Sequence, residues 1–355
     1  METSIKKGNK NKITEEDLTE ALKKIAPGTS IRTALDDIMR AEMGALILVS
    51  KDGVDAVCEG GFRLNCKFSP QKLVELAKMD GAIIISDDFK KIVSANTLLT
   101  PSMRYSSKET GTRHKAAERT AKQLKGITIA VSERKRKITV YYGDQRYELE
   151  KTSEVLRRAT ETLQILEKQK ERFDDLMISL NLLEMNNATR MSDVCNVLQR
   201  IEIIKKISDM IKRDLIELGK DGIIVSMRVK ELTKNILNDR ELILRDYFPS
   251  TYEQTGLILE KMNFDFLIET SNITRLIFEE TNDQPIAYEG RRILMKTHLL
   301  EKERDLMMSY FGTLDKLFNT SKDELLKIFK NENFVDSLLN ELNTLREKIL
   351  TGKLI

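Results

Sequence analysis

The first 150 residues alternate short apolar runs with amphipathic segments, and the two patterns predict different elements. Residues 44–50 and 82–86 are almost entirely apolar and lie next to turn-forming residues, which is typical of strands buried on both faces. Further strands are predicted at 91–99, 127–132, 137–142 and 146–150. Helical spacing and capping residues predict helices at 14–25, 30–41 and 69–78, and after Gly111. Interleaved strands and helices predict a compact α/β domain, which we expect to be a mixed sheet with flanking helices.

The pattern changes at about Thr152, where helical periodicity alone continues. Residues 152–218 contain neither proline nor glycine, so we expect long packed helices there. Residues 219–222 interrupt them, and helical periodicity then resumes as far as Tyr247. Shorter helices are predicted at 252–262, 286–299, 303–317, 322–328 and 333–349. The predicted domains are therefore an α/β domain at 1–150, an all-α spacer at 151–290 and an all-α C-terminal domain at 291–355.

The composition excludes several classes of protein. With 41% hydrophobic and 32% charged residues, the 355-residue chain is typical of a soluble, helix-rich protein. The formal net charge is only +3, so any contact with nucleic acid depends on local basic patches. Three scattered cysteines and two histidines argue against a disulfide framework, a zinc cluster or a site built on several imidazoles. No apolar run would span a bilayer and no signal peptide is evident, so we expect a cytoplasmic protein without membrane contact.

The stretch Glu109–Gln123 has an unusual charge pattern for the start of a helix. A turn centred on Gly111 is predicted, and Arg113, His114 and Lys115 follow it among good helix formers. Acidic residues are usually preferred in the first helical turn, because the helix N-terminus carries partial positive charge. Cationic side chains at that end are instead suited to binding phosphate oxygens. For this stretch alone, a solvated basic helix start is the simpler interpretation.

A second candidate is Met79-Asp80-Gly81-Ala82, where a predicted helix gives way to a buried strand. Asp80 would lie at the end of a sheet, and Gly81 would allow close backbone approach. An Asp-Gly pair alone is more simply a turn. The basic run 134–137 is likewise more simply the solvated tip of a hairpin, and His298, among apolar residues, is interpreted as structural.

Taken together, these motifs resemble the diadenylate cyclase family. Residues 79–82 are followed by Gly111-Thr112-Arg113-His114-Lys115, with Ser86, Asn96 and Pro101 between the two motifs. Further similarity at 27–29, 59–62 and 130–132, together with the long helical spacer, resembles the members of that family that scan DNA integrity.

The resemblance implies that two ATP molecules are condensed into cyclic di-AMP with release of two pyrophosphates. It implies catalytic roles for Asp80, Arg113 and His114, with Asp80 also holding Mg²⁺ or Mn²⁺. The positions that match the family's ATP-binding residues are Gly81, Leu99, Thr112, Arg113, His114, Lys115, Ala116 and Ser132. Lys115 stands where the family usually has arginine, which keeps the charge but loses the bidentate fork.

The family resemblance further implies a homo-octamer and a C-terminal helix-hairpin-helix domain that binds the DNA backbone through glycine-containing turns. The turns we assign to those hairpins, 301–305 and 329–333, lack glycine. Residues 300–355 also carry nine lysines and arginines against ten acidic residues. We therefore expect weak binding of branched DNA. A DNA-structure sensor with a weak or inactive nucleotide domain, and a structural scaffold, are the alternatives to a cyclase.

Overall fold

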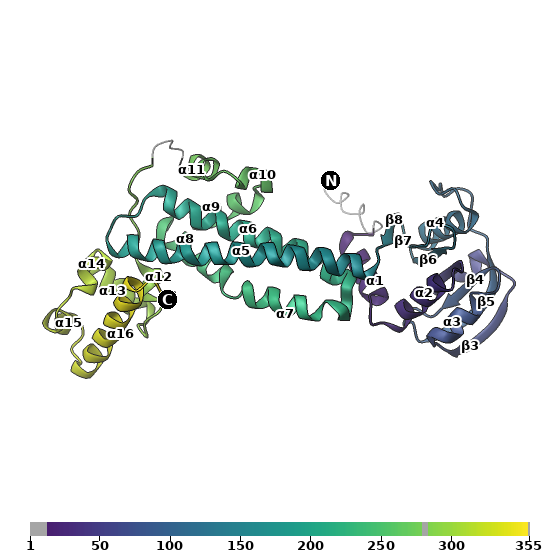
Figure 1. The fold of residues 1–355 in the computed structure, drawn as a ribbon, viewed down its shortest axis with the longest axis horizontal. Coiled ribbons are helices and arrows are strands. Elements are labelled where there is room, and N and C mark those ends of the chain that lie inside the picture. The colour runs from purple at the N-terminus through teal and green to yellow at the C-terminus, as the bar shows by residue number, and fades with distance from the viewer. Residues whose placement is uncertain (1–12, 279–282, 354–355) are drawn as a thin grey trace, which may run out of the picture. The chain divides into compact units, whose positions relative to one another are not determined.

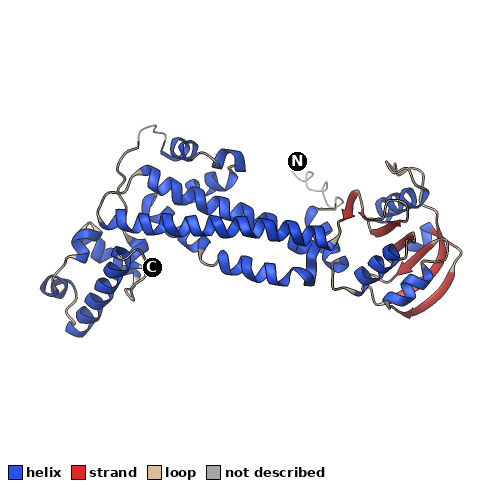
Figure 2. Ribbon diagram, in the orientation of Figure 1, coloured by secondary structure: helices blue, strands red, loops and turns tan. Residues whose placement is uncertain are grey.

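The computed structural model describes residues 13–278 and 283–353. It confirms the predicted fold class, because an N-terminal mixed α/β domain is followed by a helical region (Figures 1 and 2). The chain divides into two compact units, which are residues 1–160 with 212–226, and residues 161–211 with 227–355. The division into three domains at residues 150 and 290 stays a prediction.

The first unit contains a mixed sheet. Its strands are β1 (Ala45–Val49), β2 (Cys58–Glu59), β3 (Phe62–Lys67), β4 (Ala82–Ile85), β5 (Lys91–Leu99), β6 (Ile127–Ser132), β7 (Lys137–Tyr142) and β8 (Gln145–Leu149). Their order is β2-β5-β4-β1-β6-β7-β8, with β3 also paired to β5. β1 and β4 run parallel, whereas the other paired strands are antiparallel. The predicted strands are confirmed. β2 and β3 were not predicted, because nearly all of β3 is exposed and shows no apolar face.

Helices cover both faces of this sheet. Helices α1 (Glu15–Ile25), α2 (Ser30–Arg40) and α3 (Pro70–Leu76) share one apolar cluster with the sheet, and α4 (Thr112–Leu124) packs against the other face. The side chains of Ile47 and Ile83 belong to the first cluster, whereas their neighbours Leu48 and Ile84 belong to the second. Successive side chains of a strand point to opposite faces, so a sheet covered on both sides requires continuous apolar runs.

The remainder is helical, as predicted. Two long helices, α5 (Thr152–Met185) and α6 (Met191–Leu218), are followed by a 3-10 turn at Gly219–Gly222. The later helices are α7 (Ile223–Leu232), α8 (Ile236–Tyr247), α9 (Tyr252–Lys261), α10 (Phe264–Leu267), α11 (Thr270–Phe278), α12 (Arg291–Leu294), α13 (Glu301–Phe311), α14 (Leu314–Phe318), α15 (Lys322–Ile328) and α16 (Glu332–Leu350). Within the described residues, no helix combines the length and the apolar character needed to cross a membrane.

Several predictions for the C-terminal region are wrong in detail. The helix predicted at 286–299 is reduced to the single turn of α12, because the backbone N–H groups of Ile286 and Glu289 donate to the carbonyls of Thr189 and Asp246 instead of within a helix. The helix predicted at 303–317 is divided into α13 and α14 by Gly312, whose φ is +73°. Residues 301–305 are the first turns of α13, so the turn before that helix lies at 295–300, which also lacks glycine.

A buried polar cluster joins three helices of the second unit. Arg292 of α12 is 2% exposed and donates a 2.5 Å hydrogen bond to Glu184 of α5, which is fully buried. The Tyr247 hydroxyl of α8 donates to the other oxygen of Glu184 at 2.6 Å. Asp246 accepts hydrogen bonds from the backbone N–H groups of Arg291 and Arg292 at 3.0 and 2.9 Å. Burial raises the pKa of Asp246 from 3.8 to about 7, and nearby Glu184 adds to the effect.

This cluster predicts a pH-dependent stability. The pKa of Asp246 is raised in the folded state, so its stabilising contribution is full below pH 3.8 and is lost as pH rises through about 7. We expect that the free energy of unfolding of the parent falls over this range relative to that of Asp246→Asn. Urea titrations monitored by circular dichroism at a series of pH values would measure the difference. The exposed Asp315 provides the control variant Asp315→Asn, and parallel curves for parent and Asp246→Asn would contradict the prediction.

Candidate active site at the start of helix α4

The loop that leads into α4 is anchored by the helix itself. Glu118 is 9% exposed and accepts hydrogen bonds from the Ser107 hydroxyl at 2.5 Å and from the Lys108 backbone N–H at 3.1 Å. Lys122 donates to the second Glu118 oxygen at 2.7 Å. Burial opposes ionisation of Glu118, but the bonds from Lys122 and Ser107 outweigh it and hold the pKa of the carboxyl below its usual value. Residues 107 and 108 are therefore fixed against α4, just before the turn at Gly111.

The first turn of α4 presents unpaired backbone N–H groups, as the sequence predicts. The helix begins after Gly111, which has no side chain to cap it, and no acidic residue lies in the first turn. The first helical hydrogen bond runs from the Lys115 N–H to the Gly111 carbonyl at 2.8 Å. The N–H groups of Thr112, Arg113 and His114 therefore have no partner within the helix. Together with the helix dipole they favour an anion.

Arg113 lies over the backbone of Gly44, at the start of β1. A Cβ atom at Gly44 would lie 2.8 Å from the Arg113 Cζ, so no other residue fits there while Arg113 keeps this position. Ala45 pairs with Val131 in the register of β1 and β6, which places Gly44 beside the end of β6 at Ser132. The guanidinium of Arg113 is thus positioned at the edge of the sheet next to Ser132.

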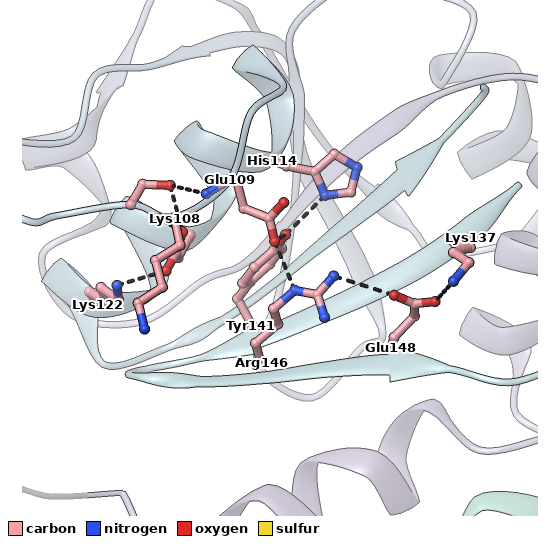
Figure 3. A network of polar contacts seen from close by, with 10 residues as sticks. Lys108, Glu109, His114, Lys122, Lys137, Tyr141, Arg146 and Glu148 are labelled. Carbon is pink, nitrogen blue, oxygen red and sulfur yellow. Dashed lines mark hydrogen bonds and ion pairs between the residues drawn. The ribbon is translucent and has the colours of Figure 1, made fainter. Parts of the chain in front are cut away.

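A chain of hydrogen bonds connects His114 to the sheet (Figure 3). His114 Nδ1 lies 2.9 Å from the hydroxyl oxygen of Tyr141. Tyr141 belongs to β7 and its side chain is fully buried. The Tyr141 hydroxyl donates to Glu109 Oε1 at 2.8 Å, and Arg146 Nε donates to the same oxygen at 2.8 Å. Through these bonds the imidazole is held by groups from β7, β8 and the loop before α4.

The environment shifts the pKa values of these groups. Burial lowers the pKa of His114, and nearby Arg146, Lys135 and Arg113 lower it further, while Glu109 acts in the opposite direction. Burial and the bond to Glu109 raise the pKa of Tyr141 well above its usual value. For Glu109 burial opposes ionisation, but the bonds from Arg146 and Tyr141 hold its pKa below normal. At neutral pH the site therefore has an ionised Glu109, a protonated Tyr141 and a neutral His114.

These groups border a hollow of about 570 Å³. That volume is in the range typical of small-molecule sites. The lining residues are Glu109, Thr110, Gly111, Thr112, Arg113, His114, Ser132, Glu133, Arg134, Lys135, Lys137, Thr139, Arg146 and Glu148. Five of them are lysine or arginine and three are glutamate, so the hollow has an excess of positive charge suited to a polyanionic ligand.

The hollow contains some of the predicted site residues and not others. Thr112, Arg113, His114 and Ser132 line it, whereas Lys115 and Ala116 do not. Ala116 packs against the apolar cluster beneath α4, and the Leu99 side chain is buried in the same cluster. The run 134–137 is exposed at the hairpin between β6 and β7, as expected, and Arg134, Lys135 and Lys137 also line the hollow.

Asp80 and Gly81 lie elsewhere on the same edge of the sheet. β1 and β4 run parallel, so Gly81 before β4 and Gly44 before β1 lie at one edge. Gly81 has a φ of +91°, and a Cβ there would lie 2.9 Å from the Asn96 carbonyl carbon, so glycine is required. The Asn96 amide donates to the Asp80 carbonyl at 3.1 Å, which fixes this turn. The Asp80 side chain is exposed and does not line the hollow.

Tyr141, Glu109, Arg146 and Gly44 were not predicted as site residues. A sequence signal existed for Tyr141, since a tyrosine at an inward-facing strand position needs a partner for its hydroxyl. Glu109 lies four residues before Arg113, so the sequence shows a carboxylate near the three cationic candidates. The role of Gly44 depends on the contact between β1 and α4, which no local pattern shows.

The chain is similar to known proteins along most of its length. A family model described as "DisA bacterial checkpoint controller nucleotide-binding" matches residues 32–146, and one described as "DisA bacterial checkpoint controller linker region" matches residues 149–284. The DNA integrity scanning protein DisA of Clostridioides difficile is 38% identical over 323 residues, which cover 89% of this chain and 91% of the relative. The protein of the same name from Clostridium botulinum strain Alaska E43 is 37% identical, covering 95% and 98%. That of Fusobacterium nucleatum is 36% identical, covering 88% of each chain.

The packing of Arg113 on Gly44 yields a prediction. Gly44→Ala should displace the guanidinium and weaken ATP binding about as much as Arg113→Ala, and the double variant should bind no more weakly than either single variant. Calorimetric titration with ATP would measure this coupling. The matched control is Gly126→Ala, because a Cβ at Gly126 would make only ordinary contacts of 3.6 Å or more. Additive losses in the double variant would show that Gly44 and Arg113 act independently.

Proposed function

Since the chain belongs to the family of the DNA integrity scanning protein DisA, we propose that it is a diadenylate cyclase that condenses two ATP molecules into cyclic di-AMP and two pyrophosphates. The observation that carries this proposal is the basic hollow at the start of α4. It combines the backbone N–H groups of the first helical turn with Arg113, Arg134 and Lys135. Such groups are suited to the phosphates of a nucleotide.

The reaction needs stabilisation of negative charge. A 3′-hydroxyl attacks an α-phosphorus, a phosphodiester bond forms, the bond to pyrophosphate breaks, and the hydroxyl proton leaves. Thr112, the neighbouring N–H groups and Arg113 bind phosphate oxygens in this proposal, with Ser132 beside them. The Arg113 guanidinium packs over Gly44, which places its donors at the edge of the sheet.

The remaining predicted residues are assigned by their places on the sheet edge. Gly81 and Leu99, at the ends of β4 and β5, border the adenosine in this proposal. Lys115 and Ala116 lie on the first turns of α4 outside the hollow, so their contacts with the nucleotide are proposed from the family resemblance alone.

Asp80 is the proposed ligand of Mg²⁺ or Mn²⁺. Among the described residues, no three His, Cys, Asp or Glu side chains gather into a site that would hold a metal by itself. An ion that keeps water and substrate phosphates as ligands needs only one or two carboxylates, and the exposed Asp80 meets that requirement. The ion would neutralise charge on the phosphates.

We propose that the active form is an assembly. Each chain contributes one copy of this hollow, whereas cyclic di-AMP has two equivalent phosphodiester bonds. Two copies in an isologous, face-to-face contact would each present one ATP to the 3′-hydroxyl of the other. By family resemblance the full assembly is a homo-octamer.

The second proposed activity, recognition of branched DNA, is expected to be weak. Two helical pairs of the C-terminal region have the helix-turn-helix connectivity expected for it, α12 with α13 and α15 with α16. Their turns, at 295–300 and 329–331, contain no glycine. The turns therefore lack the close backbone approach that a glycine allows at a phosphate.

The cyclase is tested by incubating the full chain with ATP and Mg²⁺ or Mn²⁺ and identifying the products by mass. We expect cyclic di-AMP from the parent and none from Asp80→Asn, because the variant loses the charge proposed to hold the metal. The matched control is Asp87→Asn, an exposed carboxylate in the turn after β4, which should retain activity. Near-normal turnover by a folded Asp80→Asn variant would exclude the role given to Asp80.

For DNA we expect dissociation constants of about 1 µM or weaker at physiological salt, as for non-specific binding. The reason is the near-neutral charge of residues 300–355 and the glycine-free turns. Gel-shift titrations with linear and branched duplexes would measure it. Nanomolar binding that is lost when the exposed Lys302 and Lys330 are both changed to glutamate would show the expectation to be wrong.

A further inference from the structure

We infer that Tyr141 and Glu109 are positioning residues for His114. They fix the neutral imidazole as the tautomer with its proton on Nδ1, so that Nε2 presents a lone pair to the hollow. This assignment is independent of the proposed reaction, and only its kinetic consequence rests on the proposed function.

The direction of the hydrogen bonds is set at Glu109. An ionised carboxylate only accepts hydrogen bonds, and Glu109 Oε1 receives one from Arg146 Nε and one from Tyr141, each at 2.8 Å. The guanidinium of Arg146 keeps this carboxylate ionised. The Tyr141 proton is therefore directed toward Glu109 and away from His114.

The Tyr141 hydroxyl has one proton, and Glu109 takes it. Toward His114 the phenol oxygen can then act only as an acceptor. His114 Nδ1, 2.9 Å away, must carry the proton of that bond. A neutral imidazole has one N–H, so Nε2 is left unprotonated. Figure 3 shows the second ring nitrogen of His114 turned away from Tyr141 and Glu109.

The Nε2 lone pair shares the hollow with cationic donors as well as with the carboxylates of Glu109, Glu133 and Glu148. Arg113, Arg134 and Lys135 line the hollow as donors suited to phosphate oxygens. A lone pair on Nε2 would repel such an oxygen and instead accept a hydrogen bond from a hydroxyl group. We therefore assign His114 to a ribose hydroxyl of a bound nucleotide, in place of the phosphate contact expected from the sequence.

The tautomer is directly measurable because the chain has only two histidines. The full chain is labelled with ¹⁵N-histidine, and magic-angle-spinning NMR is recorded without nucleotide, at a pH above the ordinary histidine value of about 6.5. His298, which is 93% exposed, is identified by the loss of its signals in His298→Gln. We expect His114 to be neutral with its proton on Nδ1 in the parent, and distributed over both nitrogens in Tyr141→Phe.

A second variant tests the same series of hydrogen bonds at Glu109, which is more exposed than Tyr141. Glu109→Gln can donate to the Tyr141 oxygen as well as accept from it, so the direction of the bonds is no longer fixed and both His114 tautomers should appear. A parent His114 protonated on Nε2 or on both nitrogens would overturn the inference. An unchanged Nδ1–H signal in both variants would also overturn it.

The kinetic arm compares Tyr141→Phe with Tyr142→Phe, its neighbour on β7. We expect kcat for cyclic di-AMP to fall about 10- to 100-fold in Tyr141→Phe, the usual effect of removing a group that orients a functional histidine. The KM for ATP should change little, because the phosphate-binding groups remain. Tyr142→Phe should match the parent, and equal kcat values in all three would refute the kinetic role. An inactive parent would refute the proposed cyclase alone, since the NMR result still decides the tautomer.

Discussion

The covering of the sheet on both faces is the constraint on which the first unit depends. With α1, α2 and α3 on one face and α4 on the other, the central strands have no solvated side. A polar group inside would need a partner for every donor and acceptor. Side chains that contact a ligand are therefore expected at the strand ends, and Gly44, Gly81 and Ser132 lie along one such edge. Tyr141 is the member of the site that lies deeper in the sheet, and its buried hydroxyl forms hydrogen bonds with Glu109 and His114.

The same constraint explains what the sequence predicts about the fold. Apolar runs such as 45–49 identify strands because both faces are buried, and Thr14 and Ser69 mark helix starts because their side chains accept backbone hydrogen bonds. β3 carries no such signal, since its position depends on pairing with β5 and not on burial. In the C-terminal region helical periodicity continues across Gly312, so the pattern alone does not reveal the break there.

The site is predictable where its chemistry is local. The turn at Gly111 and the residues Thr112, Arg113 and His114 follow one another in the chain, and their placement at a helix start follows from composition. Tyr141 reaches His114 because α4 packs against β7, and the pairing of β7 with β8 places Arg146 beside Tyr141. The contact of Arg113 with Gly44 likewise joins segments that are distant in the sequence. Sequence therefore predicts the groups that meet the ligand better than the groups that orient them.

Phosphate binding and the protonation of His114 are physically linked. Burial lowers the pKa of His114 and nearby Arg146, Lys135 and Arg113 lower it further, so the cationic field that suits a triphosphate also favours the neutral imidazole. A bound polyanion opposes that field, and the pKa of His114 should then rise. In the proposed reaction, the imidazole would become a better proton acceptor only when substrate phosphates are present. Glu109 also raises the pKa of His114. Its hydrogen bond is to Tyr141 and not to the imidazole, so Nε2 stays available to a ligand.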